Sequence, residues 1–251
     1  MSIKKNNEFH TPFGFKDVLR EEKDALVAEV FDNVAPKYDL MNDLMSLGLH
    51  RLWKSRLIEK IRPNPILKVL DVGGGTGDLS FKFLEMGGKE VVVADINKKM
   101  LVVGRGRALN RALINEITWV CANAEQLPIE DASFDCYVTA FCFRNVANLD
   151  RALKEAHRVL KPGGKFLCLE FSQVIIPQLA KLYDIYSFNF LPFLGQMVSK
   201  DRNSYQYLVE SIRRFPHQDE FLAQIEDSGL VKATYENILG GITAIHSAWK
   251  V

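Results

Sequence analysis

The sequence predicts an α/β protein with one seven-stranded, mostly parallel sheet and helices on both of its faces. Strand-like runs of β-branched and aliphatic residues alternate with helical stretches, as expected for a parallel sheet. One strand leads through the glycine-rich loop VLDVGGGTGD, residues 69–78, directly into a helix. The last two strands are separated only by a short turn at Gly240-Gly241, so they must be antiparallel.

The bounds of each element follow from apolar spacing and from the residues that start and stop helices. Strands are expected at 69–72, 90–95, 117–120, 134–141, 165–171, 231–235 and 243–249. Helices are expected at 21–31, 49–61, 79–86, 149–160 and 219–228, with another that begins near residue 98. In the helix after the glycine loop, Leu79, Phe83 and Met86 are spaced for one buried face.

Two segments stand apart from this alternation. Residues 1–60 are expected to form an N-terminal arm and helices, and residues 1–20 of this segment read as a flexible arm or lid anchored by Phe13 and Phe15. The domain at 61–251 is expected to carry a helical insertion at about 172–214. Its aromatic and aliphatic residues fit either a cap packed on the sheet or a surface for an apolar substrate: Tyr183, Tyr186, Phe188, Phe190, Leu191, Phe193, Leu194 and Met197.

The glycine loop lies where open α/β sheets bind small ligands, at the carboxyl end of a strand and the start of a helix. Gly73, Gly75 and Gly77 are two residues apart, and Asp78 stands where the dinucleotide fingerprint needs its third glycine. The loop instead resembles the first motif of the S-adenosylmethionine-dependent methyltransferases, in which glycines lie against the amino-acid portion of the cofactor. The alternative is an ordinary glycine-rich turn.

Polar residues also follow the next strands. Asp95, about 20 residues beyond the glycines, stands where an acid accepts hydrogen bonds from ribose hydroxyls, with a helix N-cap as the alternative. Asn123 and Ala124 resemble the methyltransferase segment that meets adenine, although Asn123 also suits a turn. Arg144 leaves the carboxyl end of the fourth strand, and resemblance to the methyltransferases implies that this end faces the transferable methyl group; the alternative for Arg144 is a surface ion pair.

Composition excludes several classes of protein. The 32 Lys and Arg residues balance 31 Asp and Glu residues, which argues against a nucleic-acid partner. The basic residues Arg105, Arg107 and Arg111 are expected on a solvated helix face. Four cysteines lack C-x-x-C spacing, so no metal site is expected. No apolar run approaches the roughly 20 residues of a spanning helix, and the N-terminus lacks a signal-peptide pattern. We therefore expect a cytoplasmic protein, with peripheral contact at the inner face of the membrane left open.

The whole chain from about Phe13 resembles the ubiquinone/menaquinone biosynthesis C-methyltransferases. Two patterns carry this resemblance, together with GGGTGD, ADIN, ANAEQLP and RNV in the family's order. One pattern runs from Arg158 to Gly164 and on to Glu170 and Ser172. Departures from the family occur at Ala140, where some members have serine, and at Cys142, where glycine is common. The other pattern lies earlier in the chain and comprises Tyr38, Asp39, Met41, Asn42, Ser46, His50 and Trp53.

The resemblance implies a class I, Rossmann-like methyltransferase that uses S-adenosylmethionine, needs no metal and methylates the ring of a prenylated quinol. It implies that residues 1–60 cap the active site and that the prenyl tail of the substrate lies along residues 183–197. The implied binding partners are this lipid substrate and either a second copy of the chain or a quinone-biosynthesis complex. Arg144, Asn145 and Tyr38 are the implied catalytic residues, with His50 as the second choice of base. The implied cofactor contacts are Gly73, Gly75, Thr76, Asp95, Asn123 and Ala124.

Three other functions stay open from the sequence. One is a class I methyltransferase for another small aromatic or lipid substrate, or for nucleic acid. Another is a nicotinamide-dependent oxidoreductase, since an acid such as Asp95 also occurs in dehydrogenases. The third is a non-catalytic member that keeps the cofactor pocket as a scaffold. The choice between a benzoquinol and a naphthoquinol acceptor is also open.

Overall fold

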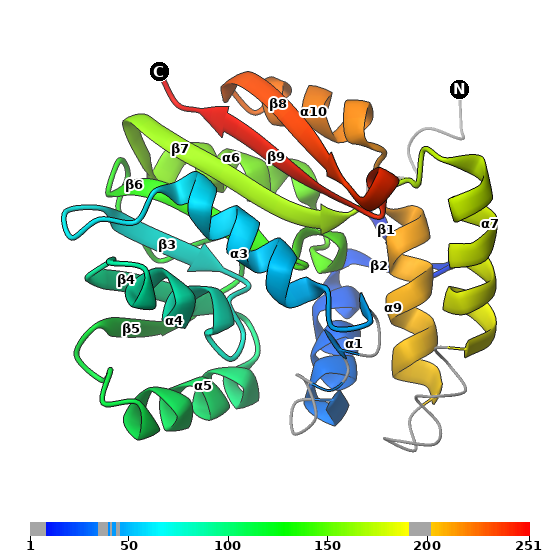
Figure 1. The fold of residues 1–251 in the computed structure, drawn as a ribbon, viewed down its shortest axis with the longest axis horizontal. Coiled ribbons are helices and arrows are strands. Elements are labelled where there is room, and N and C mark those ends of the chain that lie inside the picture. The colour runs from blue at the N-terminus through cyan, green and yellow to red at the C-terminus, as the bar shows by residue number, and fades with distance from the viewer. Residues whose placement is uncertain (1–8, 35–39, 41, 44–45, 191–201) are drawn as a thin grey trace.

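The central sheet has seven strands in the order β5-β4-β3-β6-β7-β9-β8 (Figure 1). The pairs from β5 to β7 are parallel, and β9 is antiparallel to both β7 and β8. The predicted seven-stranded sheet with one reversed strand is therefore confirmed. The computed structural model describes residues 9–34, 40, 42–43, 46–190 and 202–251.

The described elements alternate between strand and helix through most of the chain. The strands are β1 (His10–Phe13), β2 (Lys16–Leu19), β3 (Lys68–Val72), β4 (Glu90–Asp95), β5 (Ile117–Cys121), β6 (Phe134–Ala140), β7 (Leu160–Phe171), β8 (Val231–Ile238) and β9 (Thr243–Trp249). The helices are α1 (Arg20–Val34), α3 (His50–Ile61), α4 (Asp78–Glu85), α5 (Lys98–Asn110), α6 (Leu149–Val159), α7 (Pro177–Ile185), α9 (Arg202–Arg214) and α10 (Gln218–Asp227). Short helical turns are η3 (Phe143–Asn145), η4 (Tyr186–Phe190) and η5 (Leu239–Gly241).

Two apolar clusters hold the helices against the two faces of the sheet. On one face, α3, α4 and α5 pack on the sheet around residues such as Leu57, Phe83 and Val93. On the other face, α6 and α10 pack around residues such as Tyr137 and Phe221. Strands covered on both faces need continuous apolar runs, which explains the EVVVAD sequence of β4.

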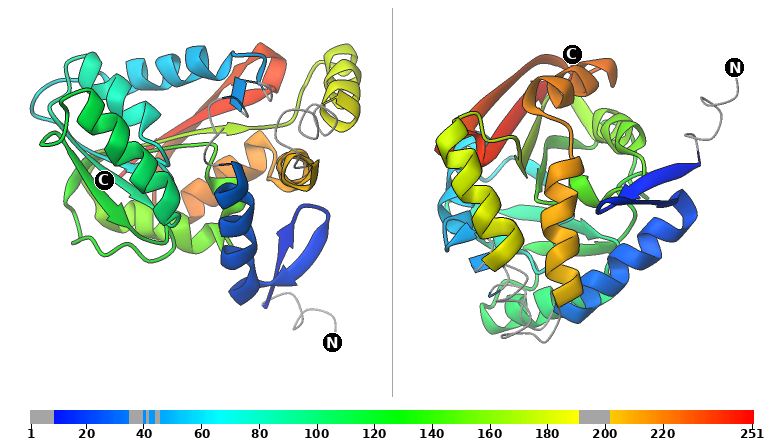
Figure 2. Two further views of the ribbon diagram at one scale, coloured as in Figure 1. Left: turned by 90° about the horizontal axis from the view of Figure 1, so that it is seen from below. Right: turned by 90° about the vertical axis from the view of Figure 1, so that its right-hand side faces the viewer.

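The carboxyl ends of the parallel strands meet at one edge of the sheet. The chain passes from β3 outward to β4 and β5, and then returns to place β6 on the other side of β3. The crevice outside β3 and β6 is thus the topological switch point, where open α/β sheets bind ligands. Helix α1, α9 and the β1–β2 hairpin lie at this same edge (Figures 1 and 2).

The N-terminal segment differs from the expected flexible arm. From His10 to Leu19 the chain forms a two-stranded hairpin that packs on the domain. The Thr11 hydroxyl donates to the carbonyl oxygen of Ala147 at 3.0 Å, and the Phe13 ring stacks on Tyr207 with centroids 4.2 Å apart. Polar composition concealed this segment because its contacts come from residues far away in the sequence.

Smaller differences concern element ends and the insertion. Met86 is 43% exposed, because α4 ends at Glu85 before its side chain can reach the core. Strand β7 already begins at Leu160, five residues before the expected start. Within the described part of 172–214 lie α7, η4 and α9. None of the helices described is both long and apolar enough to cross a membrane.

Candidate active site

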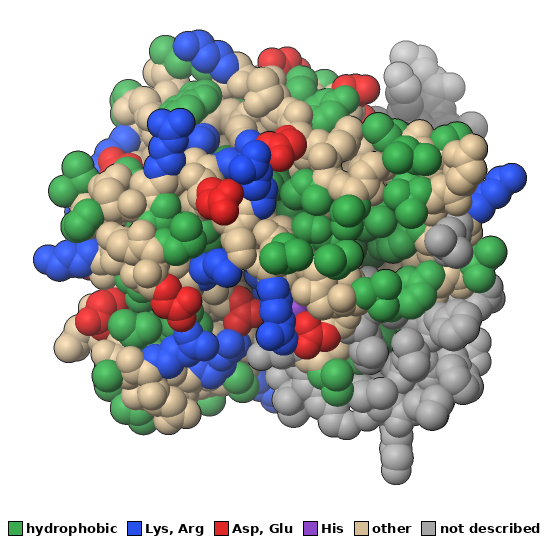
Figure 3. All heavy atoms as spheres, in the orientation of Figure 1, with side chains coloured by type: hydrophobic (Ala, Val, Ile, Leu, Met, Phe, Trp, Pro, Cys, Tyr) green, Lys and Arg blue, Asp and Glu red, His purple; other side chains and the backbone are tan. Residues whose placement is uncertain are grey.

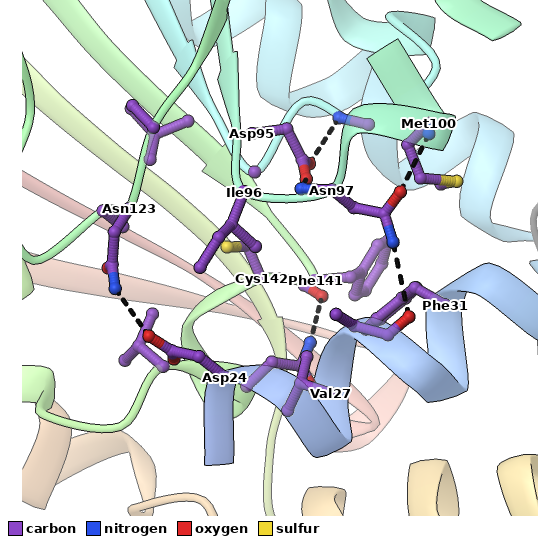
Figure 4. A pocket seen from close by; sticks show the side chains of 18 residues that line it. Asp24, Val27, Phe31, Asp95, Ile96, Asn97, Met100, Asn123, Phe141 and Cys142 are labelled. Carbon is purple, nitrogen blue, oxygen red and sulfur yellow. Dashed lines mark hydrogen bonds between the residues drawn. The ribbon is translucent and has the colours of Figure 1, made fainter. Parts of the chain in front are cut away.

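A pocket lies at the carboxyl ends of β3, β4, β5 and β6, and α1 covers it (Figure 4). Ligand sites of open α/β sheets occur at this position, outside the carboxyl ends of the strands. Of the predicted cofactor contacts, all except Thr76 line this pocket. The sequence therefore located one side of the pocket correctly. The lining residues from the strand ends are Val72, Gly73, Gly75, Asp95, Ile96, Asn97, Ala122, Asn123, Ala124, Phe141, Cys142, Asn145 and Val146.

The glycine loop forms one wall of the pocket. Gly73 and Gly75 have φ angles of +67° and +54°, which residues other than glycine rarely adopt. The Gly73 N–H donates to the carbonyl oxygen of Ala94 at 2.7 Å, so the loop starts against the neighbouring strand. A Cβ atom at Gly73 would overlap the side chain of Cys142. This position accepts no side chain while the loop keeps its conformation.

Asp95 is fixed in the pocket by two backbone donors. Its Oδ2 accepts from the Gly75 N–H at 2.9 Å and its Oδ1 accepts from the Asn97 N–H at 2.8 Å (Figure 4). Burial raises the pKa of Asp95 to about 6, while these two N–H groups lower it. Asn97, which accepts from the Met100 N–H, is the N-cap of α5, so the alternative reading of Asp95 as that cap is wrong. The carboxylate keeps lone pairs for a ligand with adjacent hydroxyls.

Asn123 lies at the opposite end of the pocket and contacts α1. Its Nδ2 donates to Asp24 Oδ2 at 2.8 Å (Figure 4). Its Oδ1 accepts from the Glu125 N–H at 2.9 Å. Burial raises the pKa of Asp24, while Lys23 and Asn123 lower it. The predicted turn-type hydrogen bond is thus present, in a residue that also lines the pocket.

The sequence suggested that residues 1–60 cap the active site but did not single out the residues of α1 that line the pocket. The side chains of Asp24, Val27, Ala28 and Phe31 line the pocket from above. Their spacing places them on one face of the helix, and this pattern was the signal that could have identified them. Asn97 also holds α1, because its Nδ2 donates to Asp32 Oδ1 at 2.9 Å.

Thr76 has a different environment from the one expected. It is buried, its hydroxyl accepts from Arg107 Nη1 at 2.7 Å, and it lies outside the pocket lining. Arg107 also pairs with Asp78 at 2.7 Å, so the predicted solvated face holds for Arg105 and Arg111 but not for Arg107. This arginine fastens α5 to the start of α4 beneath the loop.

Arg144 and Asn145 lie next to each other but face different surroundings. Arg144 is buried, and its Nη1 donates to Glu170 Oε1 at 2.8 Å and to the Phe141 carbonyl oxygen at 2.6 Å. It lies outside the lining of the pocket, whereas Asn145 lines it. Phe141 has a strained φ of +59°, and Arg144 therefore holds the turn at the end of β6. The surface ion-pair alternative for Arg144 is wrong, because the pair is buried.

The amide of Asn145 has a partner that sequence reasoning did not single out. The Tyr207 hydroxyl on α9 donates to Asn145 Oδ1 at 3.0 Å, inside the protein. Of the other two candidates, Tyr38 lies outside the described residues. His50 is buried away from the pocket, its Nε2 lies 2.9 Å from Asp43 Oδ1, and burial lowers its pKa. This arrangement agrees with a hydrogen-bonded structural histidine.

Asp71 lies behind the glycine loop, and its side chain is buried. Burial raises its pKa from 3.8 to about 7, and the Ser80 hydroxyl, which donates to Oδ2 at 2.8 Å, lowers it. The Asp71 carboxyl thus binds its proton more tightly in the folded protein than in the unfolded chain. The free energy of unfolding therefore falls as the pH rises from about 4 to about 7.

We expect Asp71→Asn to reduce this loss, because the amide carries no charge at any of these pH values. Melting temperatures at about pH 5 and about pH 8 measure the effect. Asp150→Asn, at an exposed position on α6, is the control and should leave the pH dependence of the melting temperature unchanged. An unchanged pH dependence in Asp71→Asn would show that another group is responsible.

Solved structures with a similar fold include S-adenosylmethionine-dependent methyltransferases. One from Thermotoga maritima has a TM-score of 0.64 and 17% identity, covering 89% of this chain and 99% of that chain. The [4+2]-cyclase SpnF has a TM-score of 0.66 and 17% identity, covering 89% and 94%. At such identity the likeness concerns the fold alone. The fold is that of the class I S-adenosylmethionine-dependent methyltransferases.

Within this class, the chain belongs to the ubiE/COQ5 methyltransferase family, which it matches over residues 17–250. It is 49% identical over 276 aligned positions to the human mitochondrial 2-methoxy-6-polyprenyl-1,4-benzoquinol methylase, covering 96% of this chain and 84% of that protein. It is 53% identical over 243 positions to the ubiquinone/menaquinone biosynthesis C-methyltransferase UbiE of Brucella canis, covering 95% and 90%. The predicted family is confirmed, and the chain is a methyltransferase of quinone biosynthesis.

Proposed function

We propose that this enzyme transfers a methyl group from S-adenosylmethionine to a ring carbon of a prenylated quinol. The observation that carries the proposal is the pocket, where the glycine loop, Asp95 and Asn123 meet at the switch point of the sheet. The names of the human and Brucella relatives supply the acceptor class. Acceptors of both kinds, benzoquinol and naphthoquinol, are within the proposal.

The pocket has the groups that this cofactor needs. Gly73 and Gly75 leave room beside the backbone for its amino-acid portion, and the Asp95 carboxylate suits its ribose hydroxyls. Asn123 and Ala124, which line the pocket, are the proposed contacts of its adenine. When bound, the cofactor supplies an electrophilic methyl group. No metal is part of the proposal, and the described residues include no cluster of three or more possible His, Cys, Asp or Glu ligands.

The acceptor side rests on the end of β6. A quinol carbon becomes a good nucleophile when the adjacent hydroxyl loses its proton, so donors aimed at that oxygen lower the barrier. Asn145 lines the pocket and its amide is oriented by Tyr207, so its N–H is our candidate donor. Arg144 stays charged and is no proton acceptor; it acts as a positioning residue for Phe141 and Asn145. Tyr38 is proposed as a further polar contact.

An apolar surface that suits a prenyl tail lies beside the edge of the sheet that carries the pocket. Hydrophobic side chains gather near the ends of β7 and β9 and along α7 (Figure 3). Ile185 on α7, Phe188 on η4 and Ile176 just before α7 have exposed side chains. We propose that the prenyl tail follows the insertion, including residues 191–197, which lie outside the described part of the chain. This surface also supports peripheral contact with a membrane.

Titration with S-adenosylmethionine and an assay with a short-tailed quinol test the proposal. Asp95→Ala is expected to weaken cofactor binding about 100-fold, since hydrogen bonds to a charged group contribute about 1.5–3 kcal/mol each. Asp150→Ala is the matched control, because its exposed carboxylate only pairs with Lys154. Tight binding of a nicotinamide cofactor in place of S-adenosylmethionine, or full affinity in Asp95→Ala, would contradict the proposal.

A further inference from the structure

A second pocket lies between the β1–β2 hairpin, the start of α1 and the loop after β6 (Figure 2 shows these elements side by side). Four basic residues line it, namely Arg20, Lys23, Arg144 and Arg214. All of its lining residues are described, and none of them is an aspartate or a glutamate. Val146 is the one residue that lines both this pocket and the cofactor pocket. The second pocket is therefore separate from the cofactor pocket, and its lining carries basic but no acidic side chains.

Two of the four cations are compensated by neighbouring acids. Arg144 pairs with Glu170 in the core, and Arg214 pairs with Asp17 near the surface. The other two are not compensated in this way. Within the described part of the chain, the Nε atom of the Arg20 guanidinium is buried and has no hydrogen-bond partner.

Lys23 is the second cation without a close acid. Its side chain is buried, and Nζ donates to the Val146 carbonyl oxygen at 2.7 Å. This hydrogen bond uses one of the three N–H donors of the ammonium group. Burial lowers the pKa of Lys23 to about 8, while the more distant charges of Glu125 and Asp24 raise it. Buried donors and cations without acceptors are unfavourable, so both residues gain from an anion between them.

We propose that this second pocket binds a phosphate-type oxyanion, held by Arg20 and Lys23 and bordered by Arg214. The planar guanidinium of arginine presents paired N–H donors that match the oxygens of a phosphate, and an ammonium adds a compact charge. The oxyanion supplies the acceptors that these donors lack. Its binding also fixes the start of α1 against the loop that carries Val146.

The same chemistry has two sources, free phosphate groups and phospholipid headgroups. The hairpin beside the pocket carries exposed apolar side chains, with Phe15 54% and Leu19 42% exposed. Such side chains next to a phosphate site suit the surface of a bilayer. The experiment therefore has one arm for each source.

The first arm is a calorimetric titration of the full-length protein with sodium phosphate in chloride buffer. Saturable binding at one site is expected, and Arg20→Gln is expected to weaken it by about tenfold or more, because a charge-assisted pair is lost. Arg105→Gln, an exposed arginine on α5, carries the same charge change and should bind phosphate as the wild type does.

The second arm measures co-sedimentation with vesicles of phosphatidylcholine, with and without phosphatidylglycerol. Recruitment by phosphatidylglycerol that Arg20→Gln abolishes and Arg105→Gln keeps assigns the site to lipid headgroups. Phosphate binding without such recruitment assigns it to free phosphate groups. Absence of saturable phosphate binding, or equal weakening in Arg20→Gln and Arg105→Gln, overturns the proposal.

Folding of Arg20→Gln is checked by its circular dichroism and by retained S-adenosylmethionine binding. Should this variant fail to fold, Lys23→Met replaces it, because methionine keeps the length of the buried stem and removes the ammonium group. Lys23→Met is expected to weaken phosphate binding to a similar extent. Unchanged phosphate affinity in a folded variant of either kind contradicts the assignment.

Discussion

Gly73→Ala is expected to weaken S-adenosylmethionine binding by about 100-fold or more and to abolish methyl transfer, because cofactor recognition depends on an undistorted loop. The new Cβ atom would overlap Cys142, and φ at this residue is +67°. The loop must then shift into the pocket that it lines. Calorimetric titration with the cofactor and a methyl-transfer assay measure the effect.

Two further variants distinguish two causes of a lower cofactor affinity in Gly73→Ala, namely overlap with Cys142 and strain in the backbone. Gly163 has a φ of +80°, and no atom lies within 4 Å of the place that a Cβ would take there, so Gly163→Ala adds strain without overlap and should keep cofactor affinity. Cys142→Gly removes the overlapping side chain, so Gly73→Ala/Cys142→Gly should recover part of the affinity. Equal loss in Gly73→Ala and Gly163→Ala would mean that strain alone explains the result.

Arg144→Ala is expected to lower both the methyl-transfer rate and the free energy of unfolding. Removing one partner of a buried ion pair costs about 3–5 kcal/mol, here because Glu170 is left without its cation. The rate should fall by about 10²-fold, because Asn145 and the Phe141 turn lose their support. Cofactor affinity should stay nearly intact, since Arg144 does not line that pocket. Single-turnover assays and urea unfolding measure the two effects.

The double variant Arg144→Ala/Glu170→Gln distinguishes positioning from stability. Glutamine is neutral and can still accept from the Phe171 N–H, so the double variant should regain part of the lost stability. Its methyl-transfer rate should remain low. A rate that recovers together with stability would show that Arg144 serves only the fold. A parallel loss of cofactor affinity in Arg144→Ala would contradict the assignment to the acceptor side.

Sheet and loop were predictable from the sequence because both depend on local patterns. The strand runs, the positive φ angles of the glycine loop and the positions of Asp95 and Asn123 all follow from residues close together in the chain. The family patterns added the class of reaction. Local signals of this kind are sufficient for one wall of the pocket.

The remaining walls depend on contacts between distant residues. The cover formed by α1 needs Asn123 to meet Asp24 across 99 positions, and the orientation of Asn145 needs Tyr207 across 62. Periodicity contains no information about such partners. The docked hairpin was missed for the same reason. Arg144 was correctly placed at the end of β6, but its pairing with Glu170 on the adjacent strand appears only when the strands are aligned.

Helix α1 has a kinetic consequence. It lies over the pocket and is fastened there by Asn97 and Asn123, at hydrogen bonds to Asp32 and Asp24. We expect a nucleoside-sized molecule to enter and leave past this helix, which requires these two hydrogen bonds to break and re-form in each catalytic cycle. Opening of α1 is then expected to contribute to the turnover rate, and amide hydrogen exchange along α1 should slow when S-adenosylhomocysteine, the demethylated cofactor, occupies the pocket.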